Sequence, residues 1–179
     1  MPAPARVRLA EAMLADVLEA ARAVGRVLVV APDPPALPAG VRHIADPHRG
    51  QGAAVGAALK AAAAAGLPAP FLVVNADLPC ATARDLLALA GAIPDGGIAV
   101  AGAVDGTTNA LGLAAEHLFA PLYGPGSAQR FAALAPSRAI DVPNLSDDVD
   151  TLGDLARLGP RLDPSTRGVL ATLRIGEAA

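Results

Sequence analysis

The chain has 179 residues, a formal net charge of -3 and 53% apolar residues, but only 2% aromatic residues. This length suits one domain with a sizeable core, and we expect residues 1–179 to form a single domain. The acidic balance and the scarcity of aromatic rings argue against nucleic acid as a partner. Proline and glycine break the longest apolar run, which argues against a membrane span. The single cysteine excludes an internal disulfide and favours a cytoplasmic protein.

Predicted strands and helices alternate along the chain. Short apolar runs predict strands over 26–31, 42–46, 71–77, 97–104, 110–115 and 138–143. Helical spacing and capping residues predict helices over 7–24, 53–66, 83–91, 128–135, 152–159 and 164–174. This alternation predicts an α/β fold in which helices cover both faces of a mostly parallel sheet. Ligands of such sheets gather at the carboxyl ends of the strands.

Three aspartates lie at the expected ends of elements and are candidate metal ligands. Asp77 follows the apolar run directly in 71-FLVVNAD-77, where a carboxylate beside a crevice suits Mg²⁺. Asp148 and Asp150 are two residues apart, so in an extended segment both point to the same side. Two adjacent carboxylates repel each other unless a cation lies between them. The simpler alternatives are an Asx turn at Asp77 and a solvated turn before the next helix, and we expect Asp147 to face away and be solvated.

Glycine-containing loops adjoin other predicted strands. The stretch 123-YGPGSAQRF-131 leads into a short helix whose first N–H groups suit a phosphate or carboxylate. The stretch 106-GTTN-109 follows a strand, and 46-DPHRGQGAAV-55 leads into a helix that can approach a nucleotide base or ribose. Taken alone, each of these is equally typical of an ordinary turn or cap, and the last is not a P-loop because no GK[ST] follows.

Four of these stretches together resemble one enzyme family. In order and spacing, NADLP (75–79), GTTNAL (106–111), YGPGS (123–127) and DDVDTLGDL (147–155) resemble the 2-phospho-L-lactate guanylyltransferase family, whose bacterial members use phosphoenolpyruvate as acceptor. The resemblance implies a nucleotide-diphospho-sugar transferase fold, which is a Rossmann-like three-layer sandwich. It also implies an enzyme that transfers GMP from GTP to phosphoenolpyruvate or 2-phospho-L-lactate, with release of pyrophosphate, in coenzyme F-420 biosynthesis.

The resemblance also implies roles for individual residues. The residues implied to be catalytic and to hold Mg²⁺ or Mn²⁺ are Asp77, Asp148 and Asp150. Those implied to bind the small phosphorylated carboxylic acid are Thr108, Gly124 and Ser127, with Thr107 a rival to Thr108. Those implied to bind the nucleotide GTP are Arg8, Gly50 and Gly52.

Two departures from the family pattern concern the nucleotide. The family begins with a strand and a basic loop, whereas this sequence begins almost at the first helix, so that Arg8 stands for the tail of that loop. The family's glycine loop often reads G-L-N-A-A, whereas 50-GQGAA-54 has Gly52 in place of asparagine. The alternatives are therefore another nucleotidyltransferase, such as a molybdenum-cofactor guanylyltransferase-like enzyme, or a non-catalytic ligand-binding relative without the first strand. Because a partner subunit can cover an open sheet edge, a homodimer is among the expected states.

Overall fold

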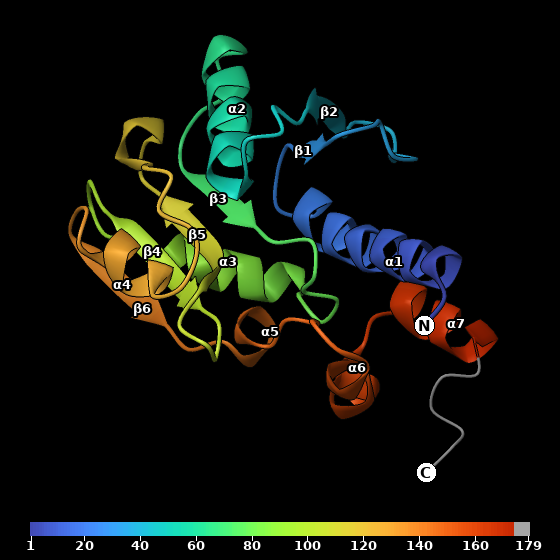
Figure 1. The fold of residues 1–179 in the computed structure, drawn as a ribbon. Helices are drawn as coiled ribbons and strands as arrows, with labels where there is room; N and C mark the ends of the chain where they lie inside the picture. Colours follow the sequence, from blue (N-terminus) through green and yellow to red (C-terminus); the bar gives the residue numbers. More distant parts are fainter. Residues whose placement is uncertain (174–179) are drawn as a thin grey trace.

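The strands of the computed structural model, which describes residues 1–173, follow the predicted order (Figure 1). They are β1 (Leu28–Ala31), β2 (Arg42–Ala45), β3 (Phe71–Val74), β4 (Ile98–Gly102), β5 (Thr108–Leu113) and β6 (Ser137–Ile140). Each is shorter than the apolar run that predicted it, except β5, which begins two residues earlier than expected.

The six predicted helices are present, with differences at their ends. The longer ones are α1 (Ala3–Arg22), α2 (Gln51–Ala64), α3 (Ala83–Gly91), α6 (Leu152–Leu158) and α7 (Pro164–Leu173). The short ones are η1 (Glu116–Leu118), α4 (Ser127–Ala132), α5 (Pro143–Ser146) and η2 (Gly159–Arg161). Of these, η1, α5 and η2 were not predicted. Residue 174, the last of the helix predicted over 164–174, lies outside the described residues. None of the described helices combines the length and the apolar character that crossing a membrane requires.

The strands form two sheets. The larger sheet has the order β3-β5-β4-β6, and the smaller sheet pairs β1 with β2 in parallel. In the larger sheet β4 and β6 are parallel, and β5 runs antiparallel to both β3 and β4. Three of its four strands therefore share one direction, which confirms the α/β class with a mostly parallel sheet. The antiparallel course of β5 was not part of the prediction.

A tight turn explains why β5 reverses direction. The Ala103 N–H donates to the carbonyl of Thr107 over 2.9 Å, and the Gly106 N–H donates to the carbonyl of Ala103 over 3.0 Å. The turn therefore lies over 103–107, earlier than the stretch 106–109 that the sequence offered as a turn. As a consequence, Thr108 and Asn109 are strand residues at the start of β5, and both side chains are buried.

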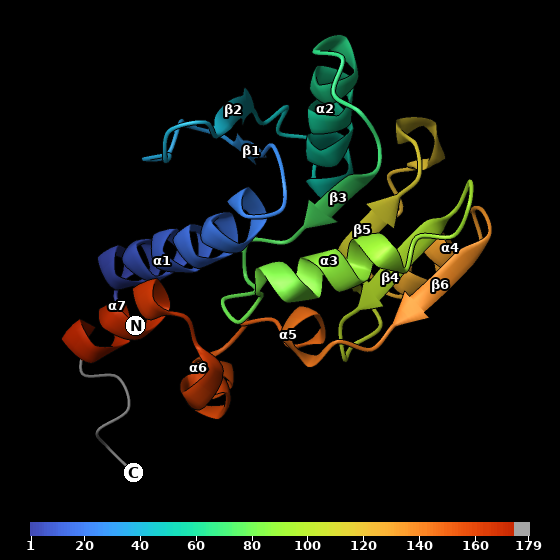
Figure 2. The same cartoon turned by 180° about the vertical axis from the view of Figure 1, so that it is seen from behind.

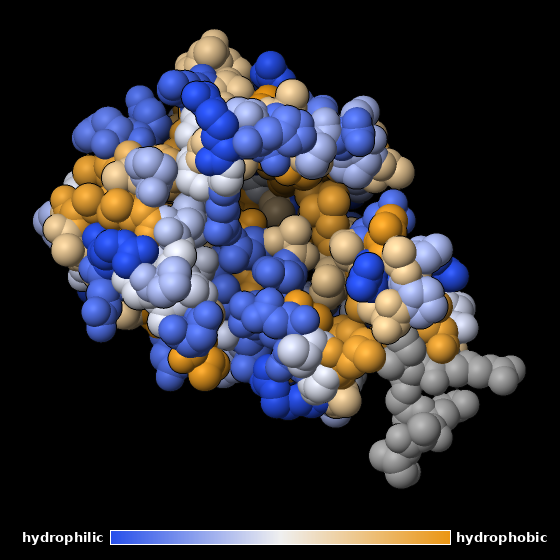
Figure 3. Space-filling view, viewed as in Figure 1, coloured by the Kyte–Doolittle hydropathy of each residue, from blue (hydrophilic) through white to orange (hydrophobic). Residues whose placement is uncertain are grey.

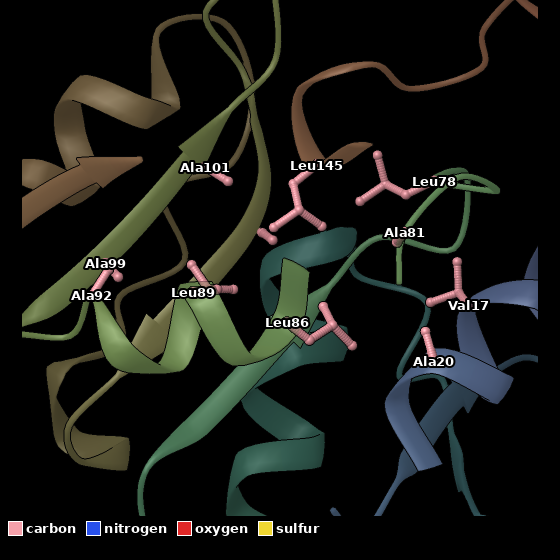
Figure 4. Close-up of a cluster of buried hydrophobic side chains, with 11 residues drawn as sticks. Val17, Ala20, Leu78, Ala81, Leu86, Leu89, Ala92, Ala99, Ala101 and Leu145 are labelled. Atoms are coloured by element: carbon pink, nitrogen blue, oxygen red, sulfur yellow. The ribbon is translucent and has the colours of Figure 1, made fainter. Parts of the chain in front are cut away.

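Helices cover both faces of the larger sheet, as the alternation of side chains along its strands requires. On β4, Ile98 and Val100 point to a cluster that α2 and α4 complete, whereas Ala99 and Ala101 point to a cluster that α1, α3 and α5 complete. The small alanines allow α3 to lie close against this second face, where Leu89 and Ala92 of the α3 region lie beside the strand alanines (Figures 2 and 4). The result is the expected three-layer sandwich.

A third cluster joins the two ends of the described chain. It lies between α1, α6 and α7, and contains Leu9, Met13, Cys80, Leu155, Leu158 and Leu162. The buried carboxylate of Asp16 on α1 accepts from the N–H of Ser165 (3.0 Å) and the N–H of Thr166 (2.8 Å). Asp16 thereby satisfies first-turn N–H groups of α7 and holds α7 against α1.

Candidate active site

Two loops bring the three predicted aspartates together. Asp77 lies just after β3, and Asp148 and Asp150 lie between α5 and α6. One carboxylate oxygen from each of the three lies within 4.8 Å of the others. The loops are joined directly, because the backbone N–H of Val149 donates to the carbonyl of Asp77 over 3.0 Å.

The extended backbone around Val149 orients the acids. The Val149 side chain packs against the cluster between α1, α6 and α7. Its neighbours Asp148 and Asp150 point to the opposite side, which confirms the prediction from their spacing. Asp147 faces away from them as predicted, but the expectation that it is merely solvated is wrong. It pairs with Arg157 at 2.8 Å and with Arg161.

Burial and mutual repulsion both act on the acidic cluster. The pKa of Asp77 is raised, mainly by burial and in addition by the charges of Asp148 and Asp150. The pKa of Asp148 is also raised, again mainly by burial and then by Asp150, while a hydrogen bond from the Asn109 side chain opposes the shift. Among the described residues, none of the ion pairs involves these three carboxylates. Within residues 1–173, no side-chain cation neutralises this concentrated negative charge.

This donor set fits a divalent metal ion. Oδ1 of Asp77 is buried and has no hydrogen-bond partner in the part of the chain that the structure describes. A buried polar atom without a partner costs about 1–3 kcal/mol, and more if it is charged. Carboxylate oxygens are the ligands that Mg²⁺ and Mn²⁺ prefer. Three converging carboxylates, one of them with an unpaired buried oxygen, are therefore chemically suited to hold such an ion.

The hydroxyl groups predicted to bind the acceptor meet in the core. Thr108 is 2% exposed and Ser127 is 0% exposed, and their oxygens lie 2.9 Å apart. Only one of the two hydroxyl protons is used in this bond, so the pair keeps one donor. Thr107, the rival of Thr108, instead donates from its N–H and its hydroxyl to Oδ1 of Asp105 in an Asx turn.

The loop that carries Gly124 is fixed by an arginine. Arg130 of α4 donates to the carbonyls of Pro125 (2.5 Å), Leu122 (2.8 Å) and Gly124 (3.5 Å). Gly124 itself has φ 110°, a conformation that favours glycine. The loop 122–126 is thus held in one shape from the side of α4.

The glycines predicted to bind the nucleotide have backbone roles at the start of α2. Gly50 is the N-cap residue with φ 82°, and a Cβ added there would meet open space. A Cβ at Gly52 would lie only 2.5 Å from Cβ of Pro121 and 2.9 Å from its Cα. Gly52 is therefore needed for close packing of α2 against the 121 segment, a constraint that sequence reasoning did not find.

Two cavities adjoin these loops. The larger, about 680 Å³, lies between α2 and residues 119–123 and is lined by Gly50, Gln51 and Gly52 among others. The smaller, about 420 Å³, lies between α1 and the segment after β3, next to Asp77. Gln51 lines both of them. Figure 3 shows the surface hollowed between α1 and the end of β3.

Arg8 lies apart from these cavities. It is exposed on α1, lines neither of the two, and donates to the hydroxyl of Thr172 on α7 over 3.3 Å. The structure thus brings together the three acids, and separately Thr108 with Ser127, but it does not bring Arg8 to them.

Three amide side chains at this site were missed by sequence reasoning. Gln51 donates to Oδ1 of Asn75 over 2.8 Å, and Asn75 donates to the carbonyl of Thr108 over 3.3 Å. Asn109 donates to the carbonyl of Ser146 over 3.4 Å. Their positions in the sequence could have indicated a role at the site, because each amide lies at the end of a predicted strand or in a glycine-containing loop.

Comparisons with known proteins agree with this arrangement. Residues 6–139 match the family model of the MobA-like NTP transferase domain. A phosphoenolpyruvate guanylyltransferase from Sphaerobacter thermophilus is 39% identical over 150 residues, covering 79% of this chain and 72% of the relative. One from Nocardia farcinica is 37% identical over 174 residues, covering 85% and 73%. One from Roseiflexus sp. is 36% identical over 165 residues, covering 84% and 72%.

A solved structure supports the fold. A crystal structure from Desulfovibrio desulfuricans, described as a nucleotide-diphospho-sugar transferase, superposes with a TM-score of 0.71 at 18% identity, covering 93% of this chain and 82% of that one. This likeness shows the fold alone, and it confirms the fold type that the sequence resemblance implied. The family match and the curated relatives go further: the chain belongs to the phosphoenolpyruvate guanylyltransferase family of nucleotidyltransferases, within the MobA-like NTP transferase domain.

Proposed function

We propose that this chain transfers a guanylyl group from GTP to phosphoenolpyruvate with release of pyrophosphate, as a step of coenzyme F-420 biosynthesis. The observation that carries the proposal is the convergence of Asp77, Asp148 and Asp150 at the end of β3. The names of the relatives supply the substrate class. 2-Phospho-L-lactate, which has the same three carbons as phosphoenolpyruvate but a single bond between C2 and C3, is the competing acceptor. A cytoplasmic location, which a single cysteine favours, is part of the proposal.

The chemistry requires few side-chain functions. An oxygen of the acceptor's phosphate forms a bond to the α-phosphorus of GTP, while the bond from that phosphorus to the bridging oxygen breaks and pyrophosphate leaves with the electron pair. The attacking oxygen is already anionic, so the reaction needs no general base. When bound by the three aspartates, a divalent metal ion would neutralise the negative charge of the triphosphate. The protein must then hold the two substrates in line.

The acceptor and the nucleotide have separate candidate sites. Thr108 and Ser127 together keep one hydroxyl proton for the acceptor's phosphate or carboxylate, beside the rigid loop at Gly124. The cavity next to Asp77 and the larger one beside Gly50 meet at Gln51, and together they offer space for a nucleotide along the edge of the sheet.

The test is pyrophosphate release by the purified 179-residue chain. GTP with phosphoenolpyruvate should give release that depends on Mg²⁺ or Mn²⁺, and ATP in place of GTP should give little. 2-Phospho-L-lactate should be the poorer acceptor. Absence of turnover with every pair, from a folded chain that still binds GTP, would favour the alternative of a non-catalytic relative.

The acceptor site has its own test. Ser127→Ala removes a buried hydroxyl that is hydrogen-bonded to Thr108, and we expect it to raise the KM for phosphoenolpyruvate far more than the KM for GTP. A control is Ser137→Ala. Ser137 is the first residue of β6 and donates its hydroxyl to the carbonyl of Ala132, so this variant also loses one serine hydrogen bond. Equal increases of both constants in Ser127→Ala would show that this hydroxyl does not contact the acceptor.

A further inference from the structure

Arg157, in α6, contacts both ends of the short segment that carries two of the three acids. Its Nη1 donates to Oδ1 of Asp147 over 2.8 Å, and its Nη2 donates to Oδ1 of Asp154 over 3.3 Å. The other oxygen of Asp154 accepts from the N–H (2.9 Å) and the hydroxyl (2.8 Å) of Thr151. Residues 147 and 151 are therefore tied together through one guanidinium group, to which neither the resemblance nor the proposed reaction assigns a role.

The two acids lie between these tied ends. Asp148 and Asp150 are each the immediate neighbour of one end, and Val149 lies between them. Val149 donates its N–H to the carbonyl of Asp77 over 3.0 Å and packs its side chain against the cluster between α1, α6 and α7. The segment 147–151 is thus held at both ends and at its centre, which fixes the backbone of both carboxylates relative to Asp77.

The charge of this arginine and its geometry have opposite effects on a cation bound nearby. A positive charge near the acidic cluster lowers the attraction of the cluster for another cation. The charge of Arg157 is paired with two carboxylates, and its side chain is half-exposed, so solvent screens what remains. The bridge, in contrast, keeps the segment in one arrangement. The sign of the change in metal affinity on substitution therefore shows which effect is larger.

We propose that Arg157 is a positioning residue, which holds Asp148 and Asp150 in place for a divalent metal ion. The inference rests on the metal site of the proposed function, to which Asp77 contributes the third carboxylate. Without the bridge, the segment can adopt arrangements in which one of the two carboxylates points elsewhere. Metal binding must then first restore the converging arrangement, so metal affinity should fall even in a variant that removes a positive charge.

The experiment is Mn²⁺ titration by calorimetry without nucleotide, with thermal melting to verify folding. Arg157→Gln removes both the charge and the bridge, whereas Arg157→Lys keeps the charge but replaces the planar two-nitrogen group by a single ammonium. We expect both variants to bind Mn²⁺ about three- to tenfold more weakly than the unaltered chain, which is the range that two exposed ion pairs can supply. If the charge alone acted, Arg157→Gln would bind Mn²⁺ more tightly and Arg157→Lys would bind it equally.

The matched control is Arg22→Gln. Arg22 also pairs with an acid three residues earlier on its own helix, Glu19, at 3.6 Å, and its side chain is similarly exposed. This pair lies on α1 and does not belong to the segment 147–151. The control should therefore change Mn²⁺ affinity by less than about twofold while it loses a comparable ion pair.

The outcomes separate the two proposals. If the unaltered chain binds Mn²⁺ and a folded Arg157 variant binds it equally well or more tightly, the positioning role is disproved and the metal site stands. An equal loss of affinity in the control would also disprove the positioning role. If the unaltered chain binds no Mn²⁺, the metal site fails and the inference fails with it.

A measurement on the unaltered chain covers the case in which the variants do not fold. Coupling between two sites is reciprocal, so an ion whose binding depends on the bridge must also strengthen the bridge. Saturating Mg²⁺ should slow the exchange of the side-chain N–H protons of Arg157 with solvent and leave that of Arg22 unchanged. Unchanged exchange at Arg157 would overturn the proposal.

Discussion

Asp77 has opposite effects on folding and on metal binding. Its buried carboxylate has an oxygen without a partner and is repelled by two other acids. Asp77→Asn removes that charge, so we expect the metal-free chain to melt at the same or a higher temperature. Mn²⁺ affinity should fall by about tenfold or more, which corresponds to about 1.4 kcal/mol or more. Calorimetry and thermal melting measure the two effects.

A matched control for that variant is Asp33→Asn, which removes one exposed carboxylate from the loop between β1 and β2. It should leave Mn²⁺ affinity unchanged. Equal affinities of Asp77→Asn and the unaltered chain would remove Asp77 from the metal site.

The raised pKa values of Asp77 and Asp148 predict how stability depends on pH. Between the ordinary carboxyl value of 3.8 and the raised values, the folded chain binds more protons than the unfolded chain. The free energy of unfolding contributed by these groups is therefore present at low pH and is lost as pH rises through this window. In urea titrations without metal, Asp77→Asn should show a smaller loss over this window than the unaltered chain. Identical pH profiles of stability for Asp77→Asn and the unaltered chain would contradict this prediction.

Single residues also show which features of the site could be predicted from the sequence and which could not. Asp148 and Asp150 could be predicted to share a side because the alternation of an extended chain is local. The arginine partners of Asp147 could not be predicted, since Arg157 and Arg161 reach it only after α6 and η2 are placed. The same holds for Gly52, whose constraint comes from Pro121, far along the chain.

At the scale of elements, Asp16 connects α1 to the first turn of α7. It is buried and accepts two backbone N–H groups, so Asp16→Ala removes the partner of the buried N–H of Thr166 and of the part-buried N–H of Ser165. Loss of a capping side chain costs about 1–2 kcal/mol of unfolding free energy, and we expect at least that here. Urea unfolding measures the loss.

The control for Asp16 is another acid on the same helix. Glu19 is exposed and pairs with Arg22 at 3.6 Å, so Glu19→Ala should change stability by less than about 0.5 kcal/mol. If Asp16→Ala and Glu19→Ala lower the free energy of unfolding equally, the two backbone hydrogen bonds of Asp16 do not contribute the expected stability.

Elements with local start signals were predictable, and elements set by tertiary contacts were not. Thr82 with Asp85 and Thr151 with Asp154 form capping boxes, so α3 and α6 begin where the sequence indicated. The four-residue α5 has no side-chain cap and was missed. β5 was expected from residue 110, because its first two residues are polar and are buried only through their contacts with Ser127 and with the loop before α6.

At the scale of the whole molecule, the two sheets leave strand edges open. Among the described residues, β1 pairs only with β2 and β3 pairs only with β5. Since Asn75 donates to Asn109 across the ladder, alternation directs the N–H groups of Leu72 and Val74 to the free edge. All four residues of β3 are apolar and only half-buried. Such an edge favours pairing with another chain.

We therefore expect the 179-residue chain to self-associate through this edge. Light scattering should give a mass above the 17.7 kDa of one chain, and the mass should rise with concentration. The amides of Leu72 and Val74 should exchange more slowly as the mass rises, whereas that of Val73 should not change. A single-chain mass at every concentration would show that the edge is not used.

The contact between Gly52 and Pro121 has a consequence for how this sequence can vary. An asparagine at position 52, as the family's loop often has, would place its Cβ 2.5 Å from that of Pro121. Position 52 cannot gain a Cβ while the backbone at 121 stays in place, so the effect of a change at 52 depends on the 121 segment. Gly52→Asn alone should be harmful, and Gly52→Asn combined with Pro121→Gly should recover only part of the lost stability, because the approach of 2.9 Å to the Cα of residue 121 remains. Evolution from one loop to the other would then have to pass through the 121 segment first.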